Sequence, residues 1–272
     1  MATFRMDTTL IKELKVKVYK YMRTHIKNRN NEEIDILKYI FEDKTLWFAN
    51  PLTFNDPFEL KPNIKQLVNE GNSFLSDVVT PYLNITKQAY KFHYASVHNI
   101  LNNIGVLSLS GNKDNLAMWA HYANNHQGLV LEFEGNHWFF NDLTLPEYAK
   151  VLQPLEKVIY IQRENRKSIC SDEYFTKQTF LTKSEDWEYE DEYRMSVYVE
   201  TEDQYLDGIC LKFLNDLLTS IYLGNKIDIE TKNYILNLLN EDEWKHLNIF
   251  QMEIDEKAYK LTNKQINGTD FI

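Results

Sequence analysis

The sequence predicts an α+β fold in which a central mixed or mainly antiparallel sheet is flanked by helices. Segments with strand-type alternation recur along the 272 residues and are separated by short helical patterns. No repeat, low-complexity block or Pro/Gly/Ser-rich linker divides the chain, and 43% apolar residues are enough for a substantial core. We therefore expect residues 1–272 to form one domain.

The first half of the chain begins with alternation in residues 10–22, where apolar side chains and tyrosines take opposite faces of a predicted strand. The capping-box spacing of Asn30 and Glu33 predicts a helix over residues 31–42. The remaining expected elements of this half are a strand from 46 to 49, a helical region in two pieces over 64–103, a strand ending at 110, a helix capped by Asp114, and a strand after Gly128.

The second half alternates strands with fewer helices. Residues 135–157 carry two prolines and no clear period, so we expect them to cover one edge of the sheet. The remaining expected elements are strands over 158–162, 193–199, 209–213 and 220–223, helices over 172–182 and 231–239, and a terminal hairpin of 247–254 with 258–261.

Charge and cysteine usage exclude several classes of protein. The chain has 30 basic and 40 acidic residues, and this net charge of −10 argues against broad binding to a nucleic-acid backbone. Cys170 and Cys210 lack the spacing of a zinc site or a disulfide framework. Neither a signal peptide nor a membrane span is evident, so we expect a cytoplasmic protein with reduced thiols and no membrane partner.

The segment from 105 to 134 is the first candidate site. Ser108 and Ser110 end a predicted strand, and Trp119, His121 and Tyr122 follow on the next helix. This order places hydroxyl, imidazole and phenol groups on one rim.

The decamer 50–59 is the second informative stretch. Its two prolines and its Asn and Asp side chains predict an ordered loop of defined shape. A rigid turn and a ligand-facing loop are both consistent with this pattern. In the second case Asp56 and Glu59 supply the polar contacts.

An acidic run over 185–192 leads into a strand on which Glu190, Glu192 and Arg194 share a face. One interpretation is an acidic loop entering an exposed edge strand, with Arg194 paired to a neighbouring carboxylate. The other is a functional glutamate at the mouth of a strand, acting as a base or stabilising a developing cation.

Four motifs in this order resemble an uncharacterised bacterial family of unknown function that is associated with mobile elements and antiphage defence islands. They are FNDPFE at 54–59, SLS at 108–110, MWAHYA at 118–123 and ExEYR at 190–194, and the resemblance spans about residues 16–261. The order of parts is also similar, more weakly, to toxin-type ADP-ribosyltransferases that modify nucleic acid.

This weaker resemblance implies NAD as cofactor. The acceptor stays open between a nucleic acid (DNA or RNA), a protein and a small molecule. An enzyme that attacks molecules of its own host would also be expected to need a neutralising partner protein. Glu192 or Glu190 would stabilise the cation-like transition state as nicotinamide leaves. The resemblance implies Lys20 or Tyr21 as the contact of the adenosine-side ribose, and Ser108, Ser110 and Tyr122 as the contacts of nicotinamide and its ribose. The loop and the helix described above add Asn55, Asp56 and Trp119 to the candidate binding residues. The first strand departs from that pattern because it lacks the usual Arg or His.

Two functions of other classes stay open. A metal-dependent nuclease or hydrolase would gather Mg²⁺ with Asp56, Glu59 and carboxylates near Glu190, although no metal motif is recognisable. A non-catalytic module would bind a nucleotide or a partner segment in an aromatic groove that depends on Trp119 or Tyr122.

Overall fold

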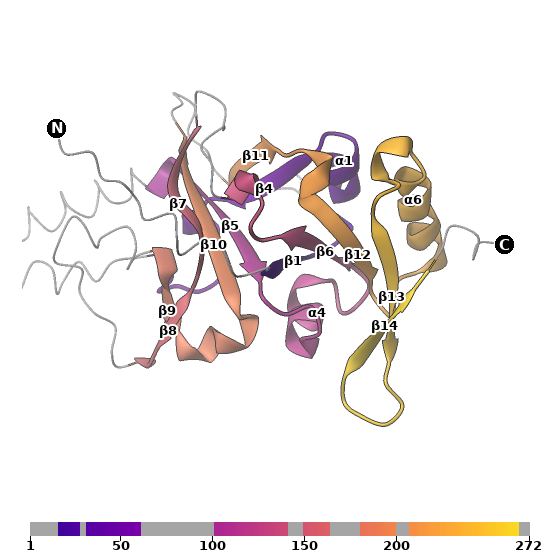
Figure 1. Cartoon of the computed structure of the whole chain (residues 1–272). Coiled ribbons are helices and arrows are strands. Elements are labelled where there is room, and N and C mark those ends of the chain that lie inside the picture. The colour runs from indigo at the N-terminus through magenta and orange to yellow at the C-terminus, as the bar shows by residue number, and fades with distance from the viewer. Residues whose placement is uncertain are drawn as a thin grey trace, which may run out of the picture.

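The computed structural model describes residues 16–27, 31–60, 101–140, 149–163, 180–199 and 207–266. Strands from both ends of the chain join one ten-stranded sheet (Figure 1). The strands of this sheet are β1 (Lys17–Met22), β4 (Thr45–Ala49), β5 (Ile104–Ser110), β6 (Leu129–Glu134), β7 (Ala149–Lys157), β10 (Glu192–Val199), β11 (Gly208–Lys212), β12 (Leu218–Leu223), β13 (Asn248–Ile254) and β14 (Leu261–Gln265).

The predicted fold class is confirmed, because the sheet is mixed and mainly antiparallel. Within the described residues, β12 and β13 form its one parallel pair, and α6 (Ile229–Leu239) connects them. Two small sheets pair β2 (His25–Lys27) with β3 (Glu33–Asp35) and β8 (Ile159–Ile161) with β9 (Thr182–Ser184). The 3₁₀ turns are η1 (Pro51–Thr53), η2 (Trp138–Phe140), η4 (Glu185–Glu190), η5 (Asn215–Leu217) and η6 (Asp242–Trp244).

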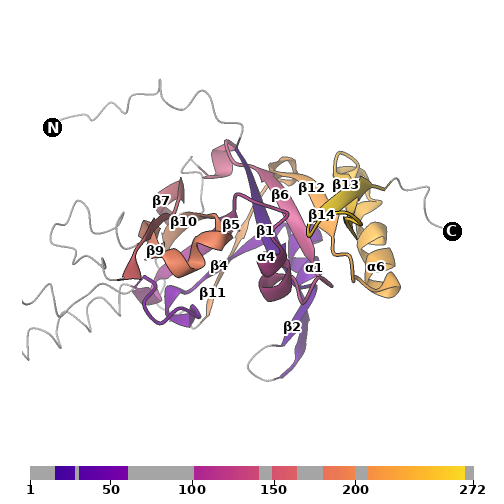
Figure 2. The same cartoon turned by 90° about the horizontal axis from the view of Figure 1, so that it is seen from below.

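The helices cover the two faces of the sheet unequally. The larger core packs one face against α1 (Ile36–Phe41) and α6, and a smaller aromatic core packs the other against α4 (Leu116–Tyr122). Figure 2 shows α4 beside β1, and α4 also contacts η4. Side chains of β1 pack into both cores, because Val18 and Met22 lie in the larger core and Tyr21 lies in the smaller one.

The two edges of β5 are used differently. Along one edge it pairs with β10 over its whole length. On the other edge Val106 is opposite Ala49 of β4, whereas Ser110 is opposite Tyr19 of β1. Between these two bridges this second edge of β5 has no strand partner among the described residues, and the candidate site lies beside this opening.

Several expected boundaries are wrong for local reasons. The helix predicted over 31–42 begins only at Ile36, because Asp35 caps it by accepting a hydrogen bond from the Leu37 amide at 2.9 Å and residues 33–35 pair as β3. Asn115, not Asp114, caps α4.

Strand pairing corrects two further expectations. Residues 149–157 are not an irregular cover but a strand, β7, which pairs with β10. Pro154 lies near a register shift of this pair, and β7 has no second partner among the described residues. Because β10 lies between β5 and β7, it is not the exposed edge strand that the acidic run suggested. The predicted helices over 64–103 and 172–182 lie largely outside the described residues.

Candidate functional site

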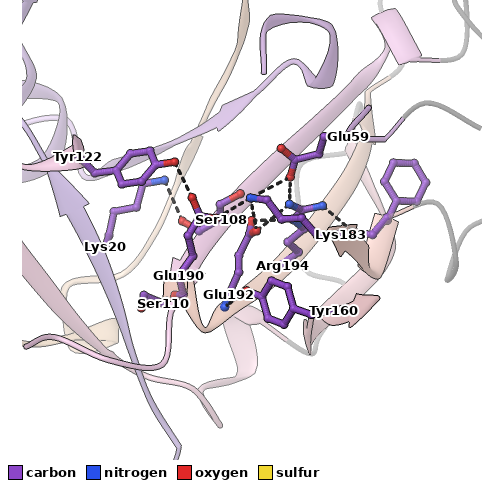
Figure 3. A network of polar contacts seen from close by, with 11 residues as sticks. Lys20, Glu59, Ser108, Ser110, Tyr122, Tyr160, Lys183, Glu190, Glu192 and Arg194 are labelled. Atoms are coloured by element: carbon purple, nitrogen blue, oxygen red, sulfur yellow. Dashed lines mark hydrogen bonds and ion pairs between the residues drawn. The ribbon is translucent and has the colours of Figure 1, made fainter. Parts of the chain in front are cut away.

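The candidate site is centred on the ammonium group of Lys183, which lies in β9 and is surrounded by three buried carboxylates (Figure 3). Lys183 Nζ lies 2.5 Å from Glu190 Oε2, 2.9 Å from Glu192 Oε2 and 3.2 Å from Glu59 Oε1. These carboxylates come from η4, the start of β10 and the 51–60 loop, so chain segments that are distant in sequence meet at one cation.

Arg194 is the second cation of this group, and its side chain is fully buried. Its guanidinium holds Glu192 with two hydrogen bonds, from Nε to Oε1 at 2.6 Å and from Nη2 to Oε2 at 2.7 Å. Nη1 donates to the Phe180 carbonyl at 3.1 Å, and Nη2 also contacts Glu59. Such bidentate pairing fixes the orientation of a carboxylate, so Glu192 is held as an anchor within this group.

Burial and the neighbouring charges shift the pKa values within this group in opposite directions. Burial lowers the pKa of Lys183, but the Glu192 and Glu190 carboxylates outweigh it and raise that pKa above its ordinary value. Burial raises the pKa of Glu192, and Lys183 opposes this rise. Glu59 Oε1 has no hydrogen bond of good geometry, although both cations lie within ion-pair distance. Each charge is therefore tolerated only because its neighbours are present.

Glu190 is the carboxylate of the group that contacts α4. Its Oε1 accepts a 2.6 Å hydrogen bond from the half-buried hydroxyl of Tyr122 on α4. Burial and the Glu190 charge raise the pKa of Tyr122, so the phenol stays protonated and donates. The partly exposed rings of Tyr189 and His121 lie beside Tyr122, with their centroids 6.3 Å apart. This arrangement places one carboxylate next to an aromatic rim.

Lys20 occupies the opening between β1 and β5. Its Nζ donates a hydrogen bond to the Ser108 carbonyl at 2.9 Å. Lys20 therefore satisfies a carbonyl group of β5 in the part of this edge that has no strand partner. Burial lowers the pKa of Lys20 to about 8, against the opposing effect of Glu192. Lys20 therefore titrates close to neutral pH in the folded protein.

The lowered pKa of Lys20 predicts how stability depends on pH. Between about pH 8 and the ordinary value of 10.5, the folded chain binds fewer protons than the unfolded chain. The free energy of unfolding of the wild type should therefore rise relative to that of Lys20→Met as pH increases through this window. Below it the lysine is charged in both states, and the difference should be constant.

Urea unfolding of both proteins from about pH 7 to pH 10 measures this difference. Lys27→Met removes an exposed lysine and is the matched control. Parallel pH profiles for the wild type and Lys20→Met would contradict the assignment.

The structure brings together some of the predicted site residues and separates others. Glu190, Glu192, Tyr122, Ser108 and Lys20 meet in one network (Figure 3). Ser110 is buried and its hydroxyl donates to the Glu190 carbonyl at 2.7 Å, so it fixes the backbone of η4.

Three other predicted residues lie apart from this network, whereas the charge of Asp56 acts on Arg194 and opposes the fall of the Arg194 pKa on burial. Trp119 is fully buried, and its indole donates to the Lys113 carbonyl at 2.8 Å. Tyr21 is buried and donates to the Asn112 carbonyl. Asp56 is buried and caps the Phe58 amide, whereas Asn55 is exposed.

Lys183 and Tyr160 are site residues that the sequence did not reveal. Tyr160 accepts a hydrogen bond from the Glu192 amide at 2.8 Å. The one available signal for Lys183 was its position just before a run of carboxylates, because buried acids need a cation nearby. Such a run is also typical of a solvated loop, so the sequence alone does not predict that Lys183 is buried beside it.

With this geometry in place, comparison with protein families gives a partial match. Residues 118–195 match the family described as "Protein of unknown function (DUF2971)". This range contains Tyr122, Lys183, Glu190, Glu192 and Arg194, and it is narrower than the 16–261 resemblance expected from the motifs. Comparisons with curated proteins and with solved structures find no match.

The described residues lack two features. None of the helices in this part of the chain is long and apolar enough to cross a membrane. Its His, Cys, Asp and Glu side chains form no group of three or more suited to a metal ion.

Proposed function

We propose that this protein is an NAD-dependent ADP-ribosyltransferase-like enzyme with Glu190 as its catalytic carboxylate. In the reaction, the bond between the nicotinamide nitrogen and ribose C1′ breaks, and nicotinamide leaves with the bonding electron pair. An acceptor nucleophile then gives an electron pair to C1′ and loses a proton. Positive charge develops on the ribose, which a nearby carboxylate stabilises.

The observation that carries this proposal is the difference between the two carboxylates of the E-x-E motif. Both oxygens of Glu192 are occupied by Arg194, and Lys183 adds a further contact. Glu190 is held by Lys183 on one oxygen and by the half-buried Tyr122 on the other. Both glutamates are buried, at 4% exposure, but Tyr122 is partly exposed, so a substrate that displaced its hydroxyl would reach Glu190.

The same contacts favour this function over the two alternatives. Lys183 occupies the centre of the three carboxylates, the place that a hydrolase of this kind would give to Mg²⁺. The binding-module hypothesis relied on Trp119 as well as Tyr122, and the Trp119 ring is enclosed in the core.

The biological setting is proposed on the sequence resemblance alone. In this proposal the protein is a cytoplasmic toxin or effector of antiphage defence that acts on a nucleic-acid or protein acceptor. An enzyme that modifies molecules of its own host would also need a neutralising partner.

Nicotinamide release from NAD, measured with cell lysate or nucleic acid as the source of acceptor, tests the proposal. Glu190→Gln should lower the rate about 100-fold or more, because it removes the charge and keeps the shape. Glu188→Gln changes an exposed acid of the same η4 turn and should leave the rate unchanged. A folded Glu190→Gln variant with the full rate, or a wild type that neither binds nor cleaves NAD, would overturn it.

A further inference from the structure

The buried ion group holds more acids than cations. It consists of Lys183, Arg194, Glu59, Glu190 and Glu192, and each of these residues is at most 7% exposed. With every member ionised, three carboxylates and two cations give a formal charge of −1. A buried charge without a counter-charge is costly. The excess carboxylate therefore needs an explanation other than the stability of the fold.

Two neighbouring charges leave this excess in place. Asp56 is 5% exposed and its charge acts on Arg194, so it adds a fourth buried acid. Lys20 interacts with the charge of Glu192 and adds a third cation. Burial lowers the pKa of Lys20 to about 8, so this positive charge is lost as the pH rises through that value. Within the described residues, four acids therefore face at most three cations here.

Glu59 is the acid whose charge is matched least well. Arg194 donates to both oxygens of Glu192, and Lys183 donates to Glu190 and Glu192. Glu59 Oε1 lies 3.2 Å from Lys183 Nζ and also contacts Arg194 (Figure 3). This oxygen is nevertheless buried without a hydrogen bond of good geometry in the described part of the chain. The excess negative charge is therefore best assigned to Glu59.

The loop that carries Glu59 holds it in this position. The Asp56 side chain accepts a hydrogen bond from the Phe58 amide at 2.8 Å, and the Asp56 carbonyl accepts one from the Glu59 amide at 3.3 Å. The Phe54 ring of the same loop lies against Arg194, with its centroid 6.0 Å from the guanidinium carbon. These contacts fix the loop on the cations and keep the Glu59 carboxylate away from water.

We propose that the excess charge carried by Glu59 makes this site selective for a ligand with a positively charged ring. This selectivity rests on the proposed function for the identity of the ring, because the nicotinamide ring of NAD is a cation and that of reduced NADH is neutral. A ring that reached Glu190 by displacing the Tyr122 hydroxyl would bring the missing positive charge to the group. Glu59 acts through its charge alone, since it is buried against Lys183 and Arg194.

Two small rings that differ in charge test the selectivity. The probes are 1-methylnicotinamide, which is a cation, and nicotinamide, which is neutral. In thermal-shift titrations of the full chain, the wild type should bind the cation about tenfold more tightly. Glu59→Gln should bind both rings equally, whereas Glu59→Asp keeps the charge and should keep the preference. Glu188→Gln removes an exposed acid of η4 and should behave as the wild type does.

Urea unfolding tests the charge excess without any ligand. Glu59→Gln should unfold at the same urea concentration as the wild type or at a higher one, because three acids then face three cations. Glu192→Gln removes the carboxylate that Arg194 holds with two hydrogen bonds, so its unfolding midpoint should fall. A fall for Glu59→Gln as large as that for Glu192→Gln would overturn the charge excess and, with it, the selectivity.

Nicotinamide release from NAD separates this selectivity from the proposed reaction. Glu59→Gln should release nicotinamide about tenfold more slowly than the wild type. A full rate together with an unchanged preference for the cationic ring would overturn the role of Glu59 and leave the reaction standing. A wild type that prefers the cationic ring and does not cleave NAD would leave the selectivity standing and refute the reaction. Equal binding of the two rings, or no binding of either at millimolar concentration, would overturn the selectivity.

Discussion

Replacing Arg194 with alanine is expected to lower the free energy of unfolding by about 3–5 kcal/mol. The guanidinium is fully buried and neutralises Glu192 and Glu59, which would otherwise be left as uncompensated carboxylates. Lys183 alone would then face three acids. Urea unfolding at neutral pH, followed by circular dichroism, measures the loss.

Arg163→Ala is the matched control for this experiment. Arg163 also makes a bidentate contact to a carboxylate, that of Asp186, but its side chain is 68% exposed. Solvent screens such a pair, so its removal should change the unfolding midpoint little. If the two alanine variants were equally stable, the buried ion group would not have the energetic role assigned to it.

Trp119→Ala should cost about 3–5 kcal/mol, the usual range for truncating a buried aromatic side chain. Trp119 fills the smaller core, where its ring makes an edge contact with Tyr21 at 5.5 Å between centroids. The change also leaves the Lys113 carbonyl without its indole donor. Thermal and urea unfolding both report this loss.

Trp138→Ala provides the comparison, because Trp138 is 40% exposed and should tolerate truncation. The result separates the two roles considered for Trp119. A large loss of stability identifies a core residue. Unchanged stability with lost ligand binding would restore the binding role that the sequence suggested.

Much of the site could be predicted from local patterns. Strand alternation located β5 and β10, and the spacing of Ser108, Tyr122, Glu190 and Glu192 indicated polar groups at the ends of neighbouring elements. The roles within that set were less visible. Whether a hydroxyl faces a substrate or a backbone carbonyl depends on partners that are distant in sequence, as the contact of Ser110 with η4 illustrates.

The sequence by itself determined the fold class, most strand positions and two of the three glutamates of the candidate site, Glu190 and Glu192, because alternation and capping act over a few residues. Only the tertiary structure decided that β10 lies between two strands and that Lys183 and Arg194 neutralise its acids. Strand order joins β10 to β5 and β7, and the ion pairs of Glu59 with Lys183 and Arg194 join segments more than a hundred residues apart. Their free energy depends on burial, which no short sequence pattern records.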